Sequence, residues 1–240
     1  MRDKGIAKQG MQVSNPKSKI QNLKLTDFRL PTPDSRINNY ALALHTTTPE
    51  LGLAISNFQG DRRDRVVHLG RDLSSLLHQN LAEFLQPQTW FDLGFIAVAR
   101  GPGGFTGTRI GVVTARTLAQ QLAIPLFAIS TLAAVAWKHR GEKPIAVQMP
   151  AQRGQLFTAI YQLTSDPQGL TPLLADTVMS PEAWQQTLAD WSTPCQLVSA
   201  EGDLGASVFQ ILELAELEWQ QGKCPHWSAA LPFYGQHPVD

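Results

Sequence analysis

The sequence predicts a mixed α/β fold, with a sheet that helices cover on both faces. Short apolar runs of β type alternate along the chain with segments whose apolar residues recur at helical spacing. The first two runs, residues 40–45 and 51–58, flank the turn sequence Thr46-Thr47-Thr48-Pro49-Glu50 and predict an antiparallel hairpin. Strands that alternate with helices after an opening hairpin are typical of a mixed sheet between helical layers.

Length and charge restrict the class of protein. The chain has 240 residues, 43% of them hydrophobic and 17% charged. This length allows one large domain or two small ones, and the apolar fraction is sufficient for a buried core. Soluble domains are charged at about 25% of positions, so the lower fraction here indicates that a partner covers part of the surface. Because 20 basic residues balance 20 acidic ones, the whole chain has no net attraction to nucleic acid.

Cysteine and hydropathy patterns exclude several further classes. Cys195 and Cys224 are too far apart for a CxxC motif, which excludes a zinc ribbon, a thioredoxin-like site and a disulfide framework. No apolar run approaches the roughly 18 residues of a membrane span. We expect a soluble, cytoplasmic protein.

The first 38 residues predict a disordered extension. They hold eight basic and three acidic residues, and their apolar residues are sparse and aperiodic. Pro31-Thr32-Pro33-Asp34-Ser35 is typical of a linker. A solvated tail explains this composition better than a basic arm that contacts RNA, and both interpretations stay open.

The remaining elements follow from periodicity, caps and breakers. Residues 65–69 can add a third strand to the hairpin, and leucines at helical spacing after the cap residue Asp72 predict a helix over residues 73–85. A buried strand at residues 95–99 and, after a glycine-rich turn, a helix over residues 109–122 come next. Further along we expect strands at residues 126–129, 144–148, 156–163 and 196–199, and helices at residues 132–138, 181–191 and 205–219.

The most informative segment is the glycine-rich turn, which reads Gly-Pro-Gly-Gly-Phe-Thr-Gly-Thr-Arg-Ile-Gly over residues 101–111. Glycines let a ligand or another chain approach the backbone, and the N-terminus of the following helix favours an anion. Thr106 and Arg109 could add a hydroxyl and a guanidinium. The spacing fits neither a Walker A loop nor GxGxxG, and the glycines can equally pack a tight turn without a ligand. The candidate ligand or partner loop comprises Gly101, Pro102, Gly103, Gly104, Phe105, Thr106, Gly107 and Arg109.

Two predicted helices carry a candidate interface. Small residues recur four apart behind the glycine-rich turn, so another helix could approach closely there. The helix over residues 73–85 has more leucine than one buried face needs, so the two could form half of an intersubunit bundle. The alternative is a contact within the domain. The candidate interface residues are Leu73, Leu76, Leu77, Leu81, Gly111, Ala115 and Ala119.

Histidine and tryptophan positions argue against two other functions. No two histidines lie four apart, which argues against the HxxxH pair of a metal-dependent peptidase, and no metal site or catalytic residue is expected. His45 is interpreted as a histidine at the edge of a loop. The six tryptophans are scattered without interleaved basic residues, so packing explains them better than RNA stacking.

The glycine-rich segment resembles the GPGSFTGxRIG signature of the TsaB family, and the resemblance continues through Ala115, Leu118-Ala119 and Pro125. It extends from Tyr40 to about Tyr161 and more loosely to Leu231-Pro-Phe-Tyr234. TsaB proteins are accessory and dimerisation subunits of the bacterial system that makes threonylcarbamoyladenosine in tRNA beside the anticodon.

The resemblance implies an actin- and Hsp70-like (ribonuclease H-like) fold with lobes at residues 39–140 and 141–240, the second truncated. It implies a TsaD-like catalytic partner, a TsaE-like ATPase and contact with tRNA only through the complex. A homodimer of the chain alone is left open, as is a nucleotide, ATP or ADP, at a degenerate site or a subunit interface.

Three departures from the family pattern limit the chemistry. In the degenerate phosphate loop His45, Thr46 and Thr47, the histidine replaces an acid, and a neutral imidazole cannot hold hydrated Mg²⁺ as a carboxylate does. Gly104 replaces the serine of GPGS, and residues 150–157 replace DARxGEVY with Pro-Ala-Gln-Arg-Gly-Gln-Leu-Phe. These losses favour a non-catalytic subunit of the transferase complex. The alternative is an ATP-dependent small-molecule kinase or ATPase of the same superfold.

Overall fold

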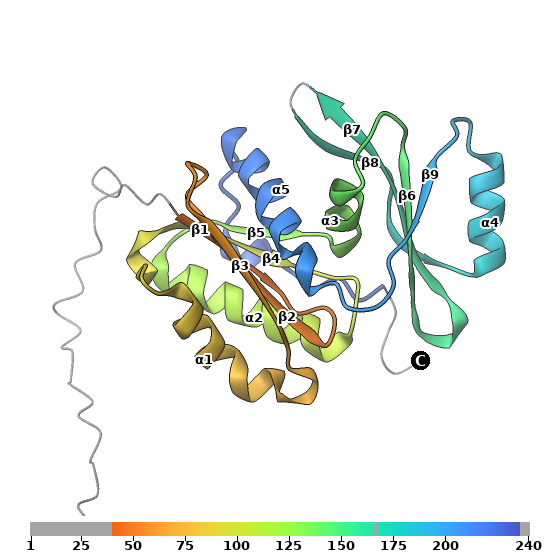
Figure 1. Cartoon of the computed structure of the whole chain (residues 1–240). Helices are drawn as coiled ribbons and strands as arrows, with labels where there is room; N and C mark the ends of the chain where they lie inside the picture. The colour runs from red at the N-terminus through yellow and green to blue at the C-terminus, as the bar shows by residue number, and fades with distance from the viewer. Residues whose placement is uncertain (1–39, 166–167, 236–240) are drawn as a thin grey trace, which may run out of the picture. The chain divides into compact units, whose positions relative to one another are not determined.

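The computed structural model describes residues 40–165 and 168–235. The expected extension over residues 1–38 lies outside the described residues. Figure 1 shows a larger and a smaller sheet with helices against them. The mixed α/β class predicted from the sequence is confirmed.

The larger sheet begins with the predicted hairpin. Strand β1 (Tyr40–His45) pairs antiparallel with β2 (Glu50–Ser56), where Leu42 faces Ile55, and it pairs parallel with β4 (Leu93–Ala99). Among the described residues the sheet has five strands in the order β3-β2-β1-β4-β5: β1 (Tyr40–His45), β2 (Glu50–Ser56), β3 (Arg62–His68), β4 (Leu93–Ala99) and β5 (Leu126–Ile129).

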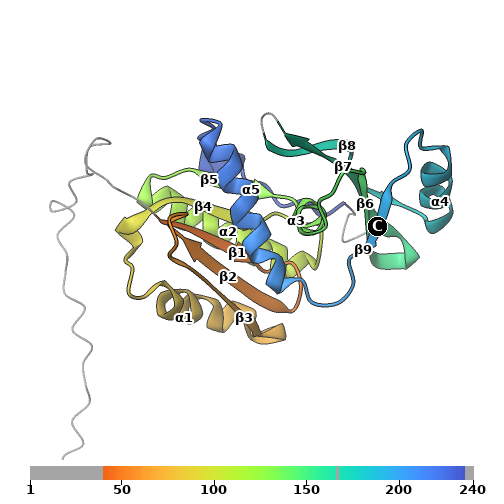
Figure 2. The ribbon, with the colours of Figure 1, turned by 45° about the horizontal axis from the view of Figure 1, so that its top comes forward.

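Helices cover both faces of this sheet, as Figures 1 and 2 show. Helices α1 (Leu73–Leu85) and α2 (Phe105–Leu122) pack on one face, and α5 (Val208–Gln220) packs on the other. The alternation along β1 fits this arrangement. Leu42 and Leu44 belong to the core under α1 and α2, while Ala41 and Ala43 belong to the core under α5.

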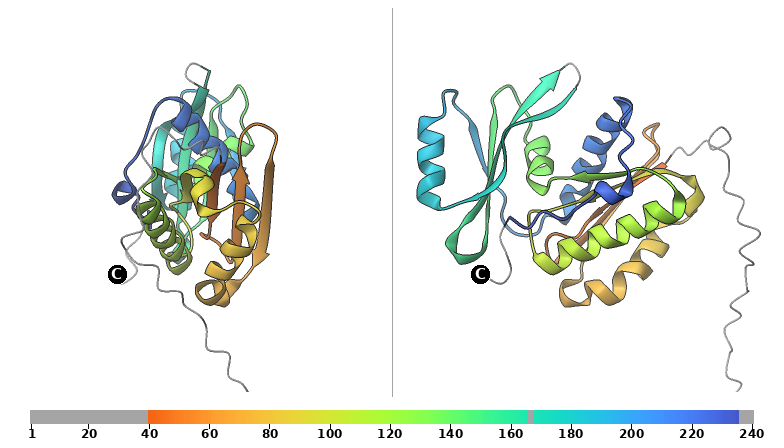
Figure 3. Two further views of the ribbon diagram at one scale, coloured as in Figure 1. Left: turned by 90° about the vertical axis from the view of Figure 1, so that its left-hand side faces the viewer. Right: turned by 180° about the vertical axis from the view of Figure 1, so that it is seen from behind.

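The smaller sheet repeats the same arrangement without a fifth strand, in the order β8-β7-β6-β9. Strand β6 pairs antiparallel with β7 and parallel with β9. Helix α3 packs on one face and α4 on the other, as Figure 3 also shows. The elements are α3 (Thr131–Lys138), β6 (Ile145–Pro150), β7 (Leu156–Ser165), β8 (Gln168–Met179), α4 (Pro181–Asp190) and β9 (Gln196–Ser199).

Three features differ from the sequence expectation. Strand β8 was not predicted, because Pro172 interrupts the strand pattern, which a strand at a sheet edge tolerates. Helix α2 begins at Phe105 rather than at residue 109. Helix α5 returns to the first sheet although it lies in the second half of the chain. The two lobes predicted at residues 39–140 and 141–240 stay a prediction.

Short 3-10 turns complete the fold: η3 (Gly70–Asp72), η4 (Trp90–Asp92), η5 (Gln152–Gly154), η6 (Gly205–Ser207) and η7 (Trp227–Ala229). Asp72 occupies the N-cap position of α1 as predicted, although its side chain makes no capping hydrogen bond. Among the described helices, none has the length and hydropathy needed to cross a membrane.

Candidate functional site

A cleft of about 1040 Å³ separates the edges of the two sheets. One wall consists of the β1–β2 turn, the segment around η3 and the start of α2. The other consists of the end of β6, the following turn and residues near β9. The lining residues are Thr46, Thr47, Thr48, Pro49, Gly70, Arg71, Leu73, Ser74, Gly103, Gly104, Phe105, Thr106, Gly107, Ile110, Met149, Pro150, Ala151, Gln152, Phe157, Ala200, Gly202 and Tyr234.

The structure brings the glycine-rich turn against the degenerate phosphate loop. A Cβ at Gly107 would lie 2.2 Å from the Thr46 carbonyl oxygen, and one at Gly111 would lie 2.1 Å from Thr46 Oγ1. A Cβ at Gly103 would lie 2.4 Å from the Thr47 carbonyl oxygen. These distances are too short for any side chain, so the glycines let two segments of this chain meet. This supports the packing interpretation of the motif.

Hydrogen bonds fix the same contact. The Gly104 N–H donates to the Thr47 carbonyl at 2.8 Å, and Thr46 Oγ1 donates to the Gly107 carbonyl at 2.8 Å. Because Gly104 is the N-cap of α2 and has no side chain, no side chain caps the first turn of this helix. That turn lines the cleft at Phe105, Thr106 and Gly107. Its backbone N–H groups and the helix dipole therefore favour an anion on this wall.

Arg109 does not join this wall. It is exposed and is absent from the cleft lining. The sequence placed it at the helix start, but α2 begins four residues earlier, so Arg109 follows the first turn. The expectation that the Arg109 guanidinium joins Thr106 at this wall is not met, because Arg109 is exposed outside the cleft lining.

His45 is the last residue of β1, next to the β1–β2 turn, and is fully buried. Its Nε2 is 3.5 Å from Thr47 Oγ1, and its Nδ1 has no hydrogen-bond partner among the described residues. Burial lowers the pKa of His45 from 6.5 to about 4. The imidazole is therefore neutral at physiological pH and lies behind the cleft wall rather than in it.

This shift predicts acid sensitivity. Between pH 6.5 and about 4 the unfolded chain protonates His45 while the folded chain does not. Stability is therefore fully present above pH 6.5 and falls as the pH falls, by about 3 kcal/mol for the full shift. Urea unfolding of the wild type and of His45→Asn between pH 6.5 and pH 4 measures this loss of unfolding free energy. The variant should lose less stability on acidification. If the unfolding free energies of both proteins fell equally with pH, the acid sensitivity would not come from His45.

The C-terminal segment closes the glycine-rich turn from the other side. The Phe105 and Tyr234 rings lie 4.4 Å apart between centroids, and the Phe233 N–H donates to the Arg100 carbonyl at 2.7 Å. Gly101 has φ +101°, and a Cβ there would meet the Phe233 carbonyl oxygen at 2.3 Å. The Leu231–Tyr234 stretch of the resemblance thus packs onto the motif itself.

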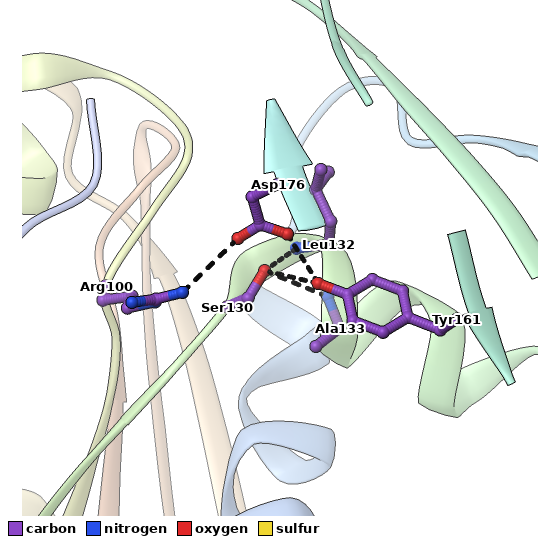
Figure 4. A network of polar contacts seen from close by, with 6 residues as sticks. All are labelled: Arg100, Ser130, Leu132, Ala133, Tyr161 and Asp176. Atoms are coloured by element: carbon purple, nitrogen blue, oxygen red, sulfur yellow. Dashed lines mark hydrogen bonds and ion pairs between the residues drawn. The ribbon is translucent and has the colours of Figure 1, made fainter. Parts of the chain in front are cut away.

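A second, separate polar cluster joins the two sheets (Figure 4). Asp176 on β8 accepts a hydrogen bond from the Tyr161 hydroxyl at 2.5 Å, and its other oxygen lies 3.9 Å from Arg100. The Tyr161 hydroxyl is also 3.3 Å from Ser130 Oγ, which caps α3. Burial, and then the Asp176 carboxylate, raises the pKa of Tyr161 well above its ordinary value. This cluster lines a cavity of about 370 Å³, and none of the described residues that line this cavity also lines the cleft.

The small-residue stripe of α2 does not face outward. Ala115 and Ala119 are completely buried in the chain's own core, and Gly111 contacts Thr46. On α1, Leu73, Leu77 and Leu81 are buried in the same core, and only Leu76 is exposed among the predicted interface leucines. The expectation that these small residues present an open surface was wrong, because they let α2 pack closely on the first sheet.

Sequence reasoning missed part of the cleft. Gly70, Arg71, Ala200 and Gly202 come from short connections without a local motif, and only the fold brings them to the rim. The turn at residues 150–154, which departs from DARxGEVY, does line the cleft through Pro150, Ala151 and Gln152.

Comparisons with known proteins agree on one family. The family model described as TsaD, tRNA N6-adenosine threonylcarbamoyltransferase, matches residues 71–192, half of the chain. A tRNA threonylcarbamoyladenosine biosynthesis protein TsaB from Bacillus subtilis (strain 168) is 36% identical over 127 residues, covering 50% of this chain and 54% of that relative. The TsaB protein of Escherichia coli (strain K12) is 31% identical over 134 residues, covering 52% and 57%. The chain thus spans about half the length of the curated relatives it matches.

Solved structures share the fold. YeaZ from Pseudomonas aeruginosa has a TM-score of 0.63 at 23% identity, covering 81% of this chain and 100% of that one. A protein with similarity to peptidase YeaZ, also from Pseudomonas aeruginosa, has a TM-score of 0.67 at 23% identity, covering 82% and 100%. These structures support the arrangement of two sheets described above.

Proposed function

Because the chain belongs to the family described as TsaD, tRNA N6-adenosine threonylcarbamoyltransferase, and is of its TsaB type, we propose that it is a non-catalytic subunit in threonylcarbamoyladenosine formation in tRNA. In this role it binds and activates a TsaD-like catalytic subunit in the cytoplasm, together with a TsaE-like ATPase. It reaches tRNA only through the complex.

One observation carries the non-catalytic assignment. Among its described lining residues the cleft has no carboxylate, imidazole or thiol, and its ionisable side chains are Arg71 and Tyr234. General acid and base catalysis needs a group that titrates near neutral pH, and a hydrated Mg²⁺ needs carboxylate ligands. His45 is completely buried and does not line the cleft. An anion such as a nucleotide phosphate can still meet the first turn of α2 and the Arg71 guanidinium.

We place the partner surface on the outward faces of α1 and α2, which lie side by side in Figures 1 and 3. Val113 on α2 is 51% exposed and Leu76 on α1 is 36% exposed. These apolar side chains lie on the helix pair that the sequence indicated and are exposed, unlike the buried stripe of α2. A homodimer of the chain alone would use the same surface.

Reconstitution tests this function. The purified chain alone should neither hydrolyse ATP nor modify tRNA, whereas adding it to the TsaD-like and TsaE-like proteins of the same organism should restore threonylcarbamoyladenosine. The measurement is nucleoside analysis of the tRNA by mass spectrometry, with each protein omitted in turn. Unchanged product without this chain would contradict the proposal. Magnesium-dependent ATP turnover by the chain alone would instead favour the kinase or ATPase alternative.

A further inference from the structure

Three potential metal ligands meet at the rim of the cleft. Glu50 on β2, His68 on β3 and Asp203 before η6 place one ligand atom each within 4.8 Å of one another. We infer that these residues form a binding site for a single Zn²⁺ ion. The inference does not depend on the proposed function.

The geometry suits a small tetrahedral ion. His68 Nδ1 and Asp203 Oδ2 are 3.5 Å apart. Around Zn²⁺, with bonds of about 2.0–2.2 Å, two tetrahedral ligand atoms lie about 3.3–3.6 Å apart. A Glu50 carboxylate oxygen lies within 4.8 Å of both atoms and can supply the third protein ligand, and water can take the fourth position.

The backbone holds Glu50 in place for this role. Its Oε2 accepts a hydrogen bond from the Gly205 N–H at 2.9 Å. A Cβ at Gly205 would lie 2.7 Å from the same oxygen, so the absence of a side chain there permits the approach. A carboxylate oriented by a backbone N–H is a common support for a metal ligand. The His68 and Asp203 side chains are 65% and 41% exposed, so an ion can reach them from solvent.

The donor set selects the class of ion. One imidazole with two carboxylates suits Zn²⁺, whereas Mg²⁺ and Ca²⁺ prefer oxygen ligands alone. The two carboxylates balance the charge of a divalent ion. Sequence spacing could not reveal the site, because 18 positions separate Glu50 from His68 and Asp203 lies in the other half of the chain.

Zinc at this position would fasten the two walls of the cleft together. The segment that carries Asp203 contributes Ala200 and Gly202 to the lining, while Pro49 and Gly70 lie beside the other two ligands in sequence. Two hydrogen bonds already link these segments, from the Leu204 N–H to Thr48 Oγ1 at 3.3 Å and from the Gly205 N–H to Glu50 Oε2 at 2.9 Å. An ion held by both would reduce opening of the rim.

The test is calorimetric titration of the untagged, metal-free full chain with ZnCl₂. We expect one ion per chain, a dissociation constant of about 10 μM or lower, and a melting temperature that rises with zinc and falls again with EDTA. His68→Ala and Asp203→Asn should each weaken binding at least tenfold. Both side chains are exposed, so the variants should fold.

His78→Ala is the matched control, because His78 is an exposed histidine on α1 outside the cluster. It should bind zinc like the wild type. Absence of saturable binding to the wild type at 100-fold the expected constant would overturn the inference. Equal loss of binding in His78→Ala, or none in His68→Ala, would overturn it as well.

Discussion

Replacing Gly111 with alanine is expected to destabilise the fold by about 3 kcal/mol, because the new Cβ would lie 2.1 Å from Thr46 Oγ1 at a packed contact. Alanine is favoured over glycine inside a helix by about 1 kcal/mol, which is too little to offset the overlap. Gly107→Ala should behave similarly, since its Cβ would lie 2.2 Å from the Thr46 carbonyl oxygen. Urea unfolding followed by circular dichroism gives the free energies.

Gly104→Ser provides the matched control within the same motif. A Cβ there would contact the Thr47 carbonyl oxygen at an ordinary 3.5 Å, and serine is a good N-cap residue. We expect no loss of stability and a gain of a few tenths of a kcal/mol at most. If all three variants unfolded at the same urea concentration as the wild type, the packing role assigned to the glycines would be wrong.

Ala115→Arg is expected to prevent folding. Ala115 is completely buried in the core between α2 and the first sheet. The larger side chain would overpack this core and bury an unpaired charge, with a combined penalty of at least about 5 kcal/mol. That is comparable to the total stability of a typical domain. Far-UV circular dichroism and size exclusion of the purified variant measure the outcome, and a folded protein with a native melting temperature would contradict it.

Val113→Arg, two residues earlier on the same helix, separates folding from association. Val113 is half exposed, so the variant should keep its fold and melting temperature. If the outward faces of α1 and α2 bind the catalytic subunit, the charge should abolish co-elution with that subunit. Normal folding with unchanged co-elution would place the partner surface elsewhere.

Local patterns in the sequence determined much of the first sheet. The hairpin of β1 and β2, the helix over Leu73–Leu85 and the strand and glycine turn before α2 follow from contacts between near neighbours. Apolar periodicity, turn residues and glycines act over a few positions, so they can be recognised in the sequence without knowledge of the fold. The motif that indicates the family is also contiguous. Strand β8 escaped prediction because an edge strand needs little apolar alternation.

Only the tertiary structure decided whether each face of a helix or strand contacts the chain's own core, a partner or solvent. In the sequence, the stripe at Gly111, Ala115 and Ala119 is equally compatible with a partner helix and with the chain's own sheet. In the structure α2 packs against β1 and β4, so the stripe faces the sheet. His45 lies at the end of a strand next to a turn in the sequence, yet it is completely buried. The cleft and the Glu50, His68 and Asp203 cluster join distant segments. Periodicity specifies that a face is apolar or small, whereas its occupant depends on long-range packing that no local window contains.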